Sequence, residues 1–311
     1  MFRPVRDTLW AAVLALSGLA TGCTVQHLVA LEGNAADAGT GGTGGTGGTG
    51  AFVFGPPSVV MGLRSPTDDL QDPTLTSDEL EIFFLSVTNG MSDIWKSQRA
   101  STTAPWGTAS MVSELSSPAQ DLNPSLSRDG LTIYFSSNRG ADVGVFSLWA
   151  SRRSARDQPW GPPEQILSLG TSPLDMAASV DASNLRMVFS SERDNMNLHL
   201  FASTRADPSA AWGPAESLTT VNSEWQDRDP CLFNQGNDLV FASRRTAQGR
   251  TSDLFHIARA DPTAPFAGVA VPLTDLNSDA WEGDPWVSED GRHILFVSDR
   301  TGTPRIYEAR R

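Results

Sequence analysis

A unit of 51 to 55 residues repeats along the chain between residue 54 and the carboxyl end. Its most regular position is a phenylalanine, which a serine follows by two positions in every copy. An arginine follows four of the five phenylalanines by four positions. The five are Phe84, Phe135, Phe189, Phe241 and Phe296. Because self-similarity at a fixed period is the signature of a repeat architecture, we expect a fold built from five like units.

Each unit is expected to form four short β-strands. The first strand is predicted just after an Asp-Pro or Asn-Pro step, for example over residues 74–76, and an Asp-Gly pair such as Asp129-Gly130 predicts a hairpin to the second strand. The second strand contains the repeated phenylalanine, the third an aliphatic-aromatic pair such as Leu148-Trp149, and the fourth follows an aromatic-small step such as Trp160-Gly161. Four strands in a unit of this length are typical of a β-propeller blade.

The two ends of the repeat region complement each other. The chain stops at Arg311, after the third strand of its fifth unit, while Phe54-Gly55-Pro56-Pro57 matches Trp160-Gly161-Pro162-Pro163, which precedes a fourth strand. An amino-terminal strand is therefore expected to complete the last blade, which leaves no open sheet edge. The predicted fold is all-β, a five-bladed β-propeller of four-stranded blades over residues 54–311.

The units resemble the WD40-like, or PD40, propeller repeat of TolB-type proteins. The resemblance rests on Asn123-Pro124, Asp129-Gly130 and Tyr134-Phe135-Ser136-Ser137-Asn138-Arg139, and on Asp284-Pro285, Asp290-Gly291 and Leu295-Phe296-Val297-Ser298-Asp299-Arg300. It covers residues 54–311 and implies the propeller architecture. This chain has five apparent blades where TolB has six, and it lacks the extra amino-terminal domain of TolB. The translocation role and the partners of TolB are therefore not implied.

The amino-terminal residues 1–22 have the features of a lipoprotein signal peptide. Arg3 and Arg6 precede an apolar stretch over residues 9–19, which is too short to span a bilayer. Small residues then lead to Cys23, as in a bacterial lipobox, so acylation of Cys23 is expected. Simple cleavage of a secretory signal, with Cys23 incidental, is the alternative. Residues 23–53 are rich in glycine and threonine and predict a flexible tether.

The excess of acidic side chains argues against polyanionic partners. The chain carries 23 basic and 36 acidic side chains, a formal net charge of −13 at pH 7. Nucleic acids and anionic membrane surfaces repel such a protein, so a lipid anchor is the only membrane contact expected. We therefore expect a monomeric propeller that is exported and anchored in the bacterial cell envelope, at the outer membrane or the periplasmic face. Its expected partner is an envelope protein, a peptide or a glycan.

Acidic and amide side chains recur directly before the repeated proline and again two residues earlier. Homologous propeller loops converge near the central channel, so these side chains are expected to ring its mouth. Crowded carboxylates repel one another, and a cation such as Ca²⁺ would relieve that repulsion. The alternative, which recurrence in nearly every unit favours, is that each residue caps its own turn. The members are Asp72, Asp121, Asn123, Asp175, Asp227, Asp229, Glu282 and Asp284.

Two tryptophans lie next to these acids. Trp225 and Trp281 come just before Asp227 and Glu282. An aromatic platform beside polar groups suits a sugar or a peptide, and packing in the core is the alternative. The arginines that follow the phenylalanines, such as Arg139, are expected to pair with an acid of the neighbouring blade.

Sequence signatures of common enzymes are absent. Some five-bladed propellers are glycosidases with three carboxylates in the central pocket, and Asp72, Asp227 and Glu282 could serve as base, modulator and acid. No spacing selects these three, because a catalytic acid pair is recognised by geometry. We therefore predict a binding or interaction module without a cofactor, and keep a carbohydrate-active hydrolase as the alternative.

Overall fold

The computed structural model describes residues 52–64, 69–88, 90–142, 144–170, 172–194, 197–246 and 251–311. The segment Val53–Arg311 forms one compact unit. The predicted signal peptide, Cys23 and the predicted tether up to residue 51 lie outside the described residues. Within those residues, no helix is long and apolar enough to cross a membrane.

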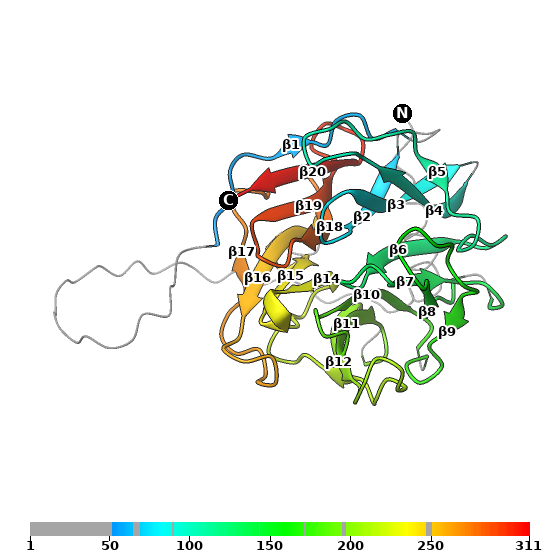
Figure 1. The fold of residues 1–311 in the computed structure, drawn as a ribbon. Helices are drawn as coiled ribbons and strands as arrows, with labels where there is room; N and C mark the ends of the chain where they lie inside the picture. Colours follow the sequence, from blue (N-terminus) through cyan, green and yellow to red (C-terminus); the bar gives the residue numbers. More distant parts are fainter. Residues whose placement is uncertain are drawn as a thin grey trace, which may run out of the picture. The chain divides into compact units, whose positions relative to one another are not determined.

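Five four-stranded antiparallel sheets surround a central axis, which confirms the predicted five-bladed propeller (Figure 1). From the axis outward, blade 1 contains β2 (Leu70–Leu75), β3 (Glu81–Thr88), β4 (Met91–Gln98) and β5 (Ser110–Met111). Blade 2 contains β6 (Asp121–Leu126), β7 (Thr132–Ser137), β8 (Ser147–Arg152) and β9 (Glu164–Gln165). Blade 3 contains β10 (Asp175–Val180), β11 (Arg186–Ser191), β12 (His199–Thr204) and β13 (Glu216–Ser217). Blade 4 contains β14 (Asp227–Phe233), the 3-10 turn η1 (Asn234–Gly236), β15 (Asp238–Ser243), β16 (Asp253–Ala258) and β17 (Val271–Pro272).

Blade 5 is closed by the two ends of the propeller. It contains β18 (Glu282–Val287), β19 (His293–Ser298), β20 (Arg305–Arg310) and β1 (Ser58–Val59). Strand β1 pairs antiparallel with β20, with Ser58 opposite Glu308 and Val59 opposite Tyr307. The innermost strands β18 and β2 also contact each other. The predicted closure by an amino-terminal strand is therefore confirmed, and the ring has no gap between its last and first blades.

The hydrophobic core lies between neighbouring blades. One cluster joins Phe83 and Ile94 of blade 1 to Ile133 and Phe135 of blade 2, and similar clusters join blades 2 and 3, blades 3 and 4, and blades 5 and 1. The five repeated phenylalanines are completely buried. Full burial of one such side chain stabilises the fold by about 1.5–3 kcal/mol, so the repeat is a packing requirement.

The innermost strands begin earlier than the sequence suggests. We expected each to start after the repeated proline, but β2, β6, β14 and β18 all contain that proline. Proline is tolerated there because the register to the second strand shifts at a β-bulge. The residue at each bulge has a left-handed backbone, with φ between 49° and 51°. The five are Asp72, Asn123, Ala177, Asp229 and Asp284.

Ala177 carries the same conformation without the side chain that favours it. Aspartate and asparagine are enriched in the left-handed region, whereas an alanine there costs about 1–2 kcal/mol. Replacing Ala177 with glycine is therefore expected to raise the free energy of unfolding by about 0.5–1 kcal/mol, after the entropy lost by glycine on folding is included. Urea unfolding measures this change. Ala178→Gly, at a neighbour without positive φ, should lower stability, and equal effects of the two changes would contradict the strain argument.

The junction of blades 5 and 1 carries a charged cluster around His293. Its Nδ1 lies 3.1 Å from Glu79 Oε1 and its Nε2 lies 3.0 Å from Glu308 Oε2. Arg310 lies 2.9 Å from Glu79. Burial opposes a charged imidazole, but hydrogen bonds to Glu308 and Glu79 outweigh it and raise the pKa of His293 above 6.5. Burial likewise opposes a charged Glu79, but hydrogen bonds from His293 and Arg310 lower its pKa to about 2.

These shifts predict how stability depends on pH. The raised pKa of His293 contributes stability that is complete below pH 6.5 and is lost as the pH rises through the raised value. The lowered pKa of Glu79 contributes stability above pH 4.5, which is lost as the pH falls towards about 2. Urea unfolding from pH 5 to pH 9 should therefore show a loss of stability above pH 6.5 that is absent in His293→Gln. Identical pH profiles of the two proteins would exclude His293 as the cause.

Candidate functional site

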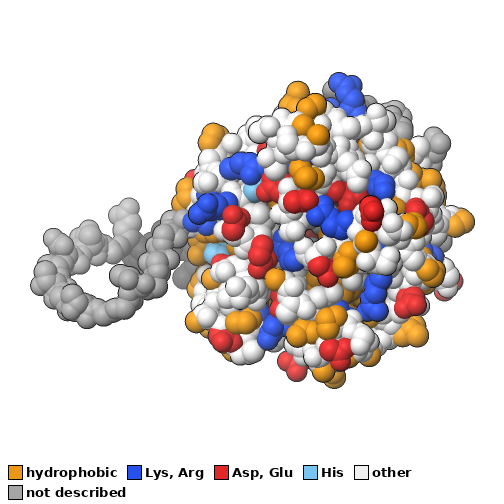
Figure 2. Space-filling view, in the orientation of Figure 1, with side chains coloured by type: hydrophobic (Ala, Val, Ile, Leu, Met, Phe, Trp, Pro, Cys, Tyr) orange, Lys and Arg blue, Asp and Glu red, His pale blue; other side chains and the backbone are white. Residues whose placement is uncertain are grey.

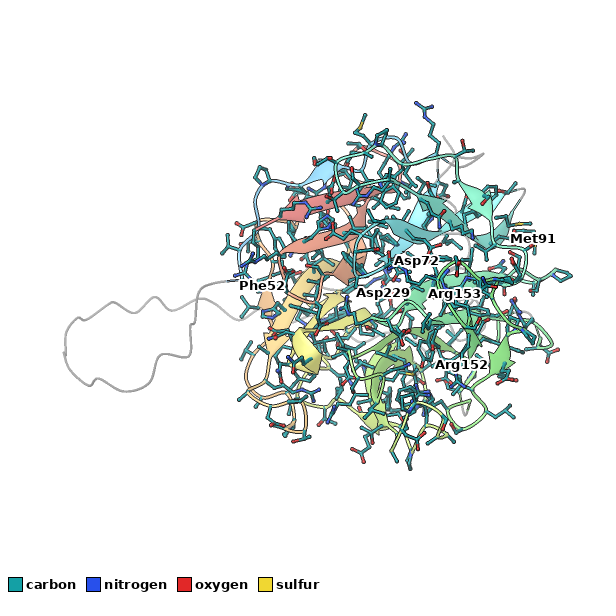
Figure 3. All side chains as sticks on the ribbon, viewed as in Figure 1. Phe52, Asp72, Met91, Arg152, Arg153 and Asp229 are labelled. Atoms are coloured by element: carbon teal, nitrogen blue, oxygen red, sulfur yellow. The ribbon has the colours of Figure 1, made fainter. Side chains whose placement is uncertain are left out.

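A narrow channel runs along the propeller axis between the innermost strands. Its cavity measures about 50 Å³ and is lined by residues of β2, β6, β10, β14 and β18. Four predicted site residues line it: Asp72, Asn123, Asp229 and Asp284. Figure 3 shows Asp72 and Asp229 near the centre of the ring, with Arg152 farther out. Pockets for small molecules usually measure roughly 300–1,000 Å³, so this channel has room for little more than water.

The side chains at the channel bond to the backbone of the next blade. Asp284 Oδ2 accepts the N–H of Asp72 at 3.4 Å, and Asp72 Oδ2 accepts the N–H of Asn123 at 3.3 Å. Asn123 Nδ2 also donates to Asp72 Oδ1 at 2.9 Å. In the two blades that follow, Ser136 and Ser190 accept the corresponding N–H groups. Four of the five left-handed residues are thus bonded to the preceding blade, and Asp284 and Asp72 serve as acceptors between blades.

One end of the channel is crossed by Arg128, which follows β6. Its guanidinium donates to the carbonyl oxygens of Leu232 at 2.7 Å and Val287 at 3.0 Å, and its Nε lies 3.1 Å from Glu289. The side chain therefore ties blade 2 to blades 4 and 5. Charged side chains of both signs surround the centre of the face seen in Figure 2. No sequence pattern pointed to Arg128, because the other units carry different residue types at this position.

The other four predicted acids lie inside the blades, not at the channel. Asp121, Asp175, Asp227 and Glu282 begin the innermost strands, and their side chains are at most 1% exposed. Each pairs with the arginine that follows the repeated phenylalanine, at 2.5 to 3.0 Å. The β-bulge between each acid and the residue two positions later places the two side chains in different surroundings.

The repeated arginines act within a blade, so the expected pairing with a neighbouring blade is wrong. Arg139 lies 2.5 Å from Asp121, bonds to Ser137, and lies over the rings of Phe135 and Trp149. Arg193, Arg245 and Arg300 repeat this arrangement. Because the arginine and the acid lie at the same end of two paired strands, the partner in the same blade is the nearer one.

A second set of arginines, which the sequence analysis missed, stacks on the aromatic residue before each fourth strand. Arg153 lies 4.4 Å from the ring centre of Trp160 and donates to the carbonyl of Gly130. Arg99, Arg205 and Arg259 do the same in their blades. Arg153 also pairs with Glu81 of blade 1 at 2.7 Å, and both side chains are at most 3% exposed. One member of this second set, Arg153, therefore makes a buried ion pair between blades.

The two candidate tryptophans differ in exposure. Trp225 lies on the loop before β14 and is 36% exposed. Trp281 packs against the core, and the guanidinium of Arg228 lies 5.4 Å from its ring centre. A Cβ at Gly283 would come within 2.3 Å of the Trp281 ring, so glycine is needed there to admit the indole. Neither tryptophan lines the channel cavity.

The described residues do not assemble a metal site or the three carboxylates considered for hydrolysis. No three histidine, cysteine, aspartate or glutamate side chains among them are grouped so as to hold a metal ion. Of the candidate base, modulator and acid, Asp72 lines the channel, while Asp227 and Glu282 are paired with arginines inside blades 4 and 5. Cys231 also lines the channel, and burial raises the pKa of its thiol, which disfavours a nucleophilic thiolate.

No protein-family model and no curated protein matches the sequence. Among solved structures, TolB from Acinetobacter baumannii is similar with a TM-score of 0.52 and 15% identity, over 80% of this chain and 56% of that chain. An endo-arabinase from Bacteroides thetaiotaomicron is similar with a TM-score of 0.55 and 16% identity, over 83% of this chain and 97% of that chain. The catalytic domain of an α-L-arabinofuranosidase from Coprinopsis cinerea is similar with a TM-score of 0.56 and 10% identity, over 83% of this chain and 96% of that chain. At these identities the likeness shows the propeller fold alone.

Proposed function

We propose that the propeller is a binding module without catalytic activity, which presents its loops and blade junctions to an envelope protein, peptide or glycan. The observation that carries this proposal is the filled channel. It measures about 50 Å³, and Arg128 crosses it at one end. A ring held by repeated buried bonds provides a rigid support for loops, and loops on a rigid support are a common place for binding residues.

The hydrolase alternative is less well supported. A glycosidase needs two carboxyl groups about 5 to 10 Å apart with a sugar between them. Asp227 and Glu282 are fully buried and each pairs with an arginine, so neither is available to a sugar in the channel. The arabinan-degrading enzymes share the fold with this chain, but a shared fold does not carry the reaction.

We also propose that Cys23 is acylated and that residues 24–53 tether the propeller to the envelope. The support is the sequence of residues 1–53, in which a short apolar stretch, a cysteine and a glycine-rich segment follow one another. Mass spectrometry of the amino-terminal peptide of the exported protein tests acylation. A lipid-modified Cys23 that is lost in Cys23→Ser supports the anchor, and an unmodified mature terminus contradicts it.

Photo-crosslinking in the envelope tests the binding function. A photoreactive residue is placed at Trp225, at Leu167 or at Val269, which are exposed positions in three different regions of the ring. A binding module should crosslink one partner from one or two of these positions, and that partner should then bind the purified protein with a defined Kd. Uniform crosslinking from all three positions, or hydrolysis of arabinan that disappears in Asp72→Asn, would contradict the proposal.

A further inference from the structure

A cavity of about 450 Å³ lies between blades 2 and 3, away from the channel. Its apolar surface comes from the rings of Tyr134 and Trp212 and from Ile166 and Leu167. Leu167 is 76% exposed at the rim. Its volume is in the range of small-molecule pockets, and its lining of aromatic and aliphatic residues with a few charges is typical of them.

The cavity exists because small side chains coincide at this junction. On the third strand, the position opposite Tyr134 is Ala150; blade 3 also has an alanine there, Ala202, whereas blades 1, 4 and 5 have Lys96, His256 and Glu308. Before Trp212 the chain has Ala211, where three other units have Pro105, Pro159 and Pro265. A feature that every blade needs for folding should recur in every blade, and this combination does not. The fold therefore does not require it.

Charged groups of both signs border the cavity. Arg152 is exposed and donates one hydrogen bond, to the carbonyl oxygen of Pro208 at 2.9 Å, so most of its donors face solvent. Glu164 lies opposite Ala150 on β9 and is also exposed. Within the described part of the chain, neither side chain forms an ion pair. An arginine at this position is not common to all blades: blade 5 has Arg310 there, while blades 1, 3 and 4 have Gln98, Thr204 and Ala258.

The remaining walls are held rigidly. Arg205 lies 4.2 Å from the ring centre of Trp212 and donates to the Tyr134 hydroxyl at 3.0 Å and to the Asn184 carbonyl at 2.8 Å. The Tyr134 hydroxyl in turn donates to Asn184 Oδ1 at 2.7 Å. A fixed aromatic wall with a guanidinium and a carboxylate at the rim is preorganised for a ligand with an apolar body and both charges.

We propose that this cavity binds the free end of a short apolar peptide. An apolar side chain enters beside Trp212 and Leu167, the carboxyl-terminal carboxylate pairs with Arg152, and the amino group of a dipeptide-sized ligand pairs with Glu164. This inference rests on the proposed binding function and adds a site and a ligand class to it. The carboxylate is the decisive group, because a guanidinium binds it through two parallel hydrogen bonds.

Calorimetric titration with the dipeptide Leu-Phe, its carboxyl-terminal amide and its N-acetyl form tests the site on the purified protein. Leu-Phe should bind, and its amide should bind at least about tenfold more weakly, which corresponds to one charge-assisted contact. Arg152→Gln should weaken the affinity for Leu-Phe by the same factor and leave the affinity for the amide unchanged. Likewise, Glu164→Gln should weaken the affinity for Leu-Phe and leave the affinity for the N-acetyl form unchanged. Arg292→Gln, at an arginine 79% exposed in blade 5, is the matched control and should bind like the wild type.

Three results would overturn the inference: no binding of Leu-Phe at millimolar concentration, equal affinities for the acid and the amide, or unchanged affinity in Arg152→Gln. All variants are at exposed positions, and circular dichroism verifies that they remain folded. If a partner crosslinks in the envelope but Leu-Phe does not bind, the cavity assignment fails and the binding function stands. If arabinan is hydrolysed, the binding function fails by its own test.

Discussion

Replacing Asp227 with alanine is expected to lower the free energy of unfolding by about 3 kcal/mol, because Arg245, whose side chain is 21% exposed, and two hydrogen-bond donors lose their acceptor. The Asp227 side chain is completely buried, and its Oδ1 lies 2.6 Å from Arg245. Its Oδ2 accepts the backbone N–H of Ser223 at 2.5 Å and the Ser223 hydroxyl at 2.8 Å. The change leaves the Arg245 guanidinium and the two Ser223 donors without this acceptor. Urea unfolding followed by circular dichroism measures the loss.

The same measurement distinguishes a folding role from a binding role for Asp227. Carboxylates in a ligand site commonly destabilise the empty protein, so removing one would leave stability unchanged or raise it. Asp279→Ala, at an exposed position of the loop between β17 and β18, serves as the control and should change stability by no more than about 0.5 kcal/mol. A loss at Asp227 no larger than that of the control would contradict the structural role.

Replacing Arg128 with alanine is expected to lower stability by about 3 kcal/mol and to open the channel. Two hydrogen bonds from a charged donor are lost, each worth about 1.5–3 kcal/mol, partly offset by water reaching the freed carbonyl groups. The bonds join blade 2 to Leu232 of blade 4 and Val287 of blade 5. Because three blades are tied through one side chain, the loss should affect the whole ring and not one loop.

The thiol of Cys231 gives a second readout of this change. Cys231 lines the channel and is 5% exposed, and Arg128 lines the same cavity. In a Cys23→Ser background, Cys231 is the remaining cysteine. Its modification by a thiol reagent should be faster in Arg128→Ala than in the parent, because the gain in access to the thiol outweighs the rise in its pKa that follows loss of the Arg128 charge. Arg156→Ala, at an exposed arginine of the same blade, should leave the rate unchanged, and an unchanged rate in Arg128→Ala would contradict closure by this residue.

The sequence predicts the architecture well because the repeat is a packing requirement. A phenylalanine that must be buried between blades recurs at each junction, and the unmatched strand at residues 58–59 reveals how the ring closes. The bulge could not be predicted, since Ala177 shares its geometry without the Asp-Pro or Asn-Pro signal. For the same reason Asp121 and Asn123, only two residues apart, were assigned to one face, although a bulge separates their surroundings.

The candidate sites were harder to predict because residues that recur in the units serve folding, whereas a binding site is expected to occur once. The acids that recur in most units stabilise the fold: Asp72 bonds blade 1 to Asn123 of blade 2, and Asp227 pairs with Arg245 within blade 4. A residue that occurs in one unit only, such as Arg128 across the channel, cannot be recognised from the repeat pattern. The cavity between blades 2 and 3 arises where alanines replace larger residues, and the absence of a side chain is visible only after the strands are aligned in space.

Thermal unfolding of the purified protein with separate ligands tests most directly whether this propeller binds at a blade junction or acts at its channel. A ligand that binds only the folded state raises Tm, and the rise grows with the logarithm of ligand concentration above Kd. We expect Leu-Phe to raise Tm in the wild type and not in Arg152→Gln, and calcium, EDTA and arabinotriose to leave it unchanged. A rise in Tm with calcium or arabinotriose that disappears in Asp72→Asn would contradict the account and identify the channel as the functional site.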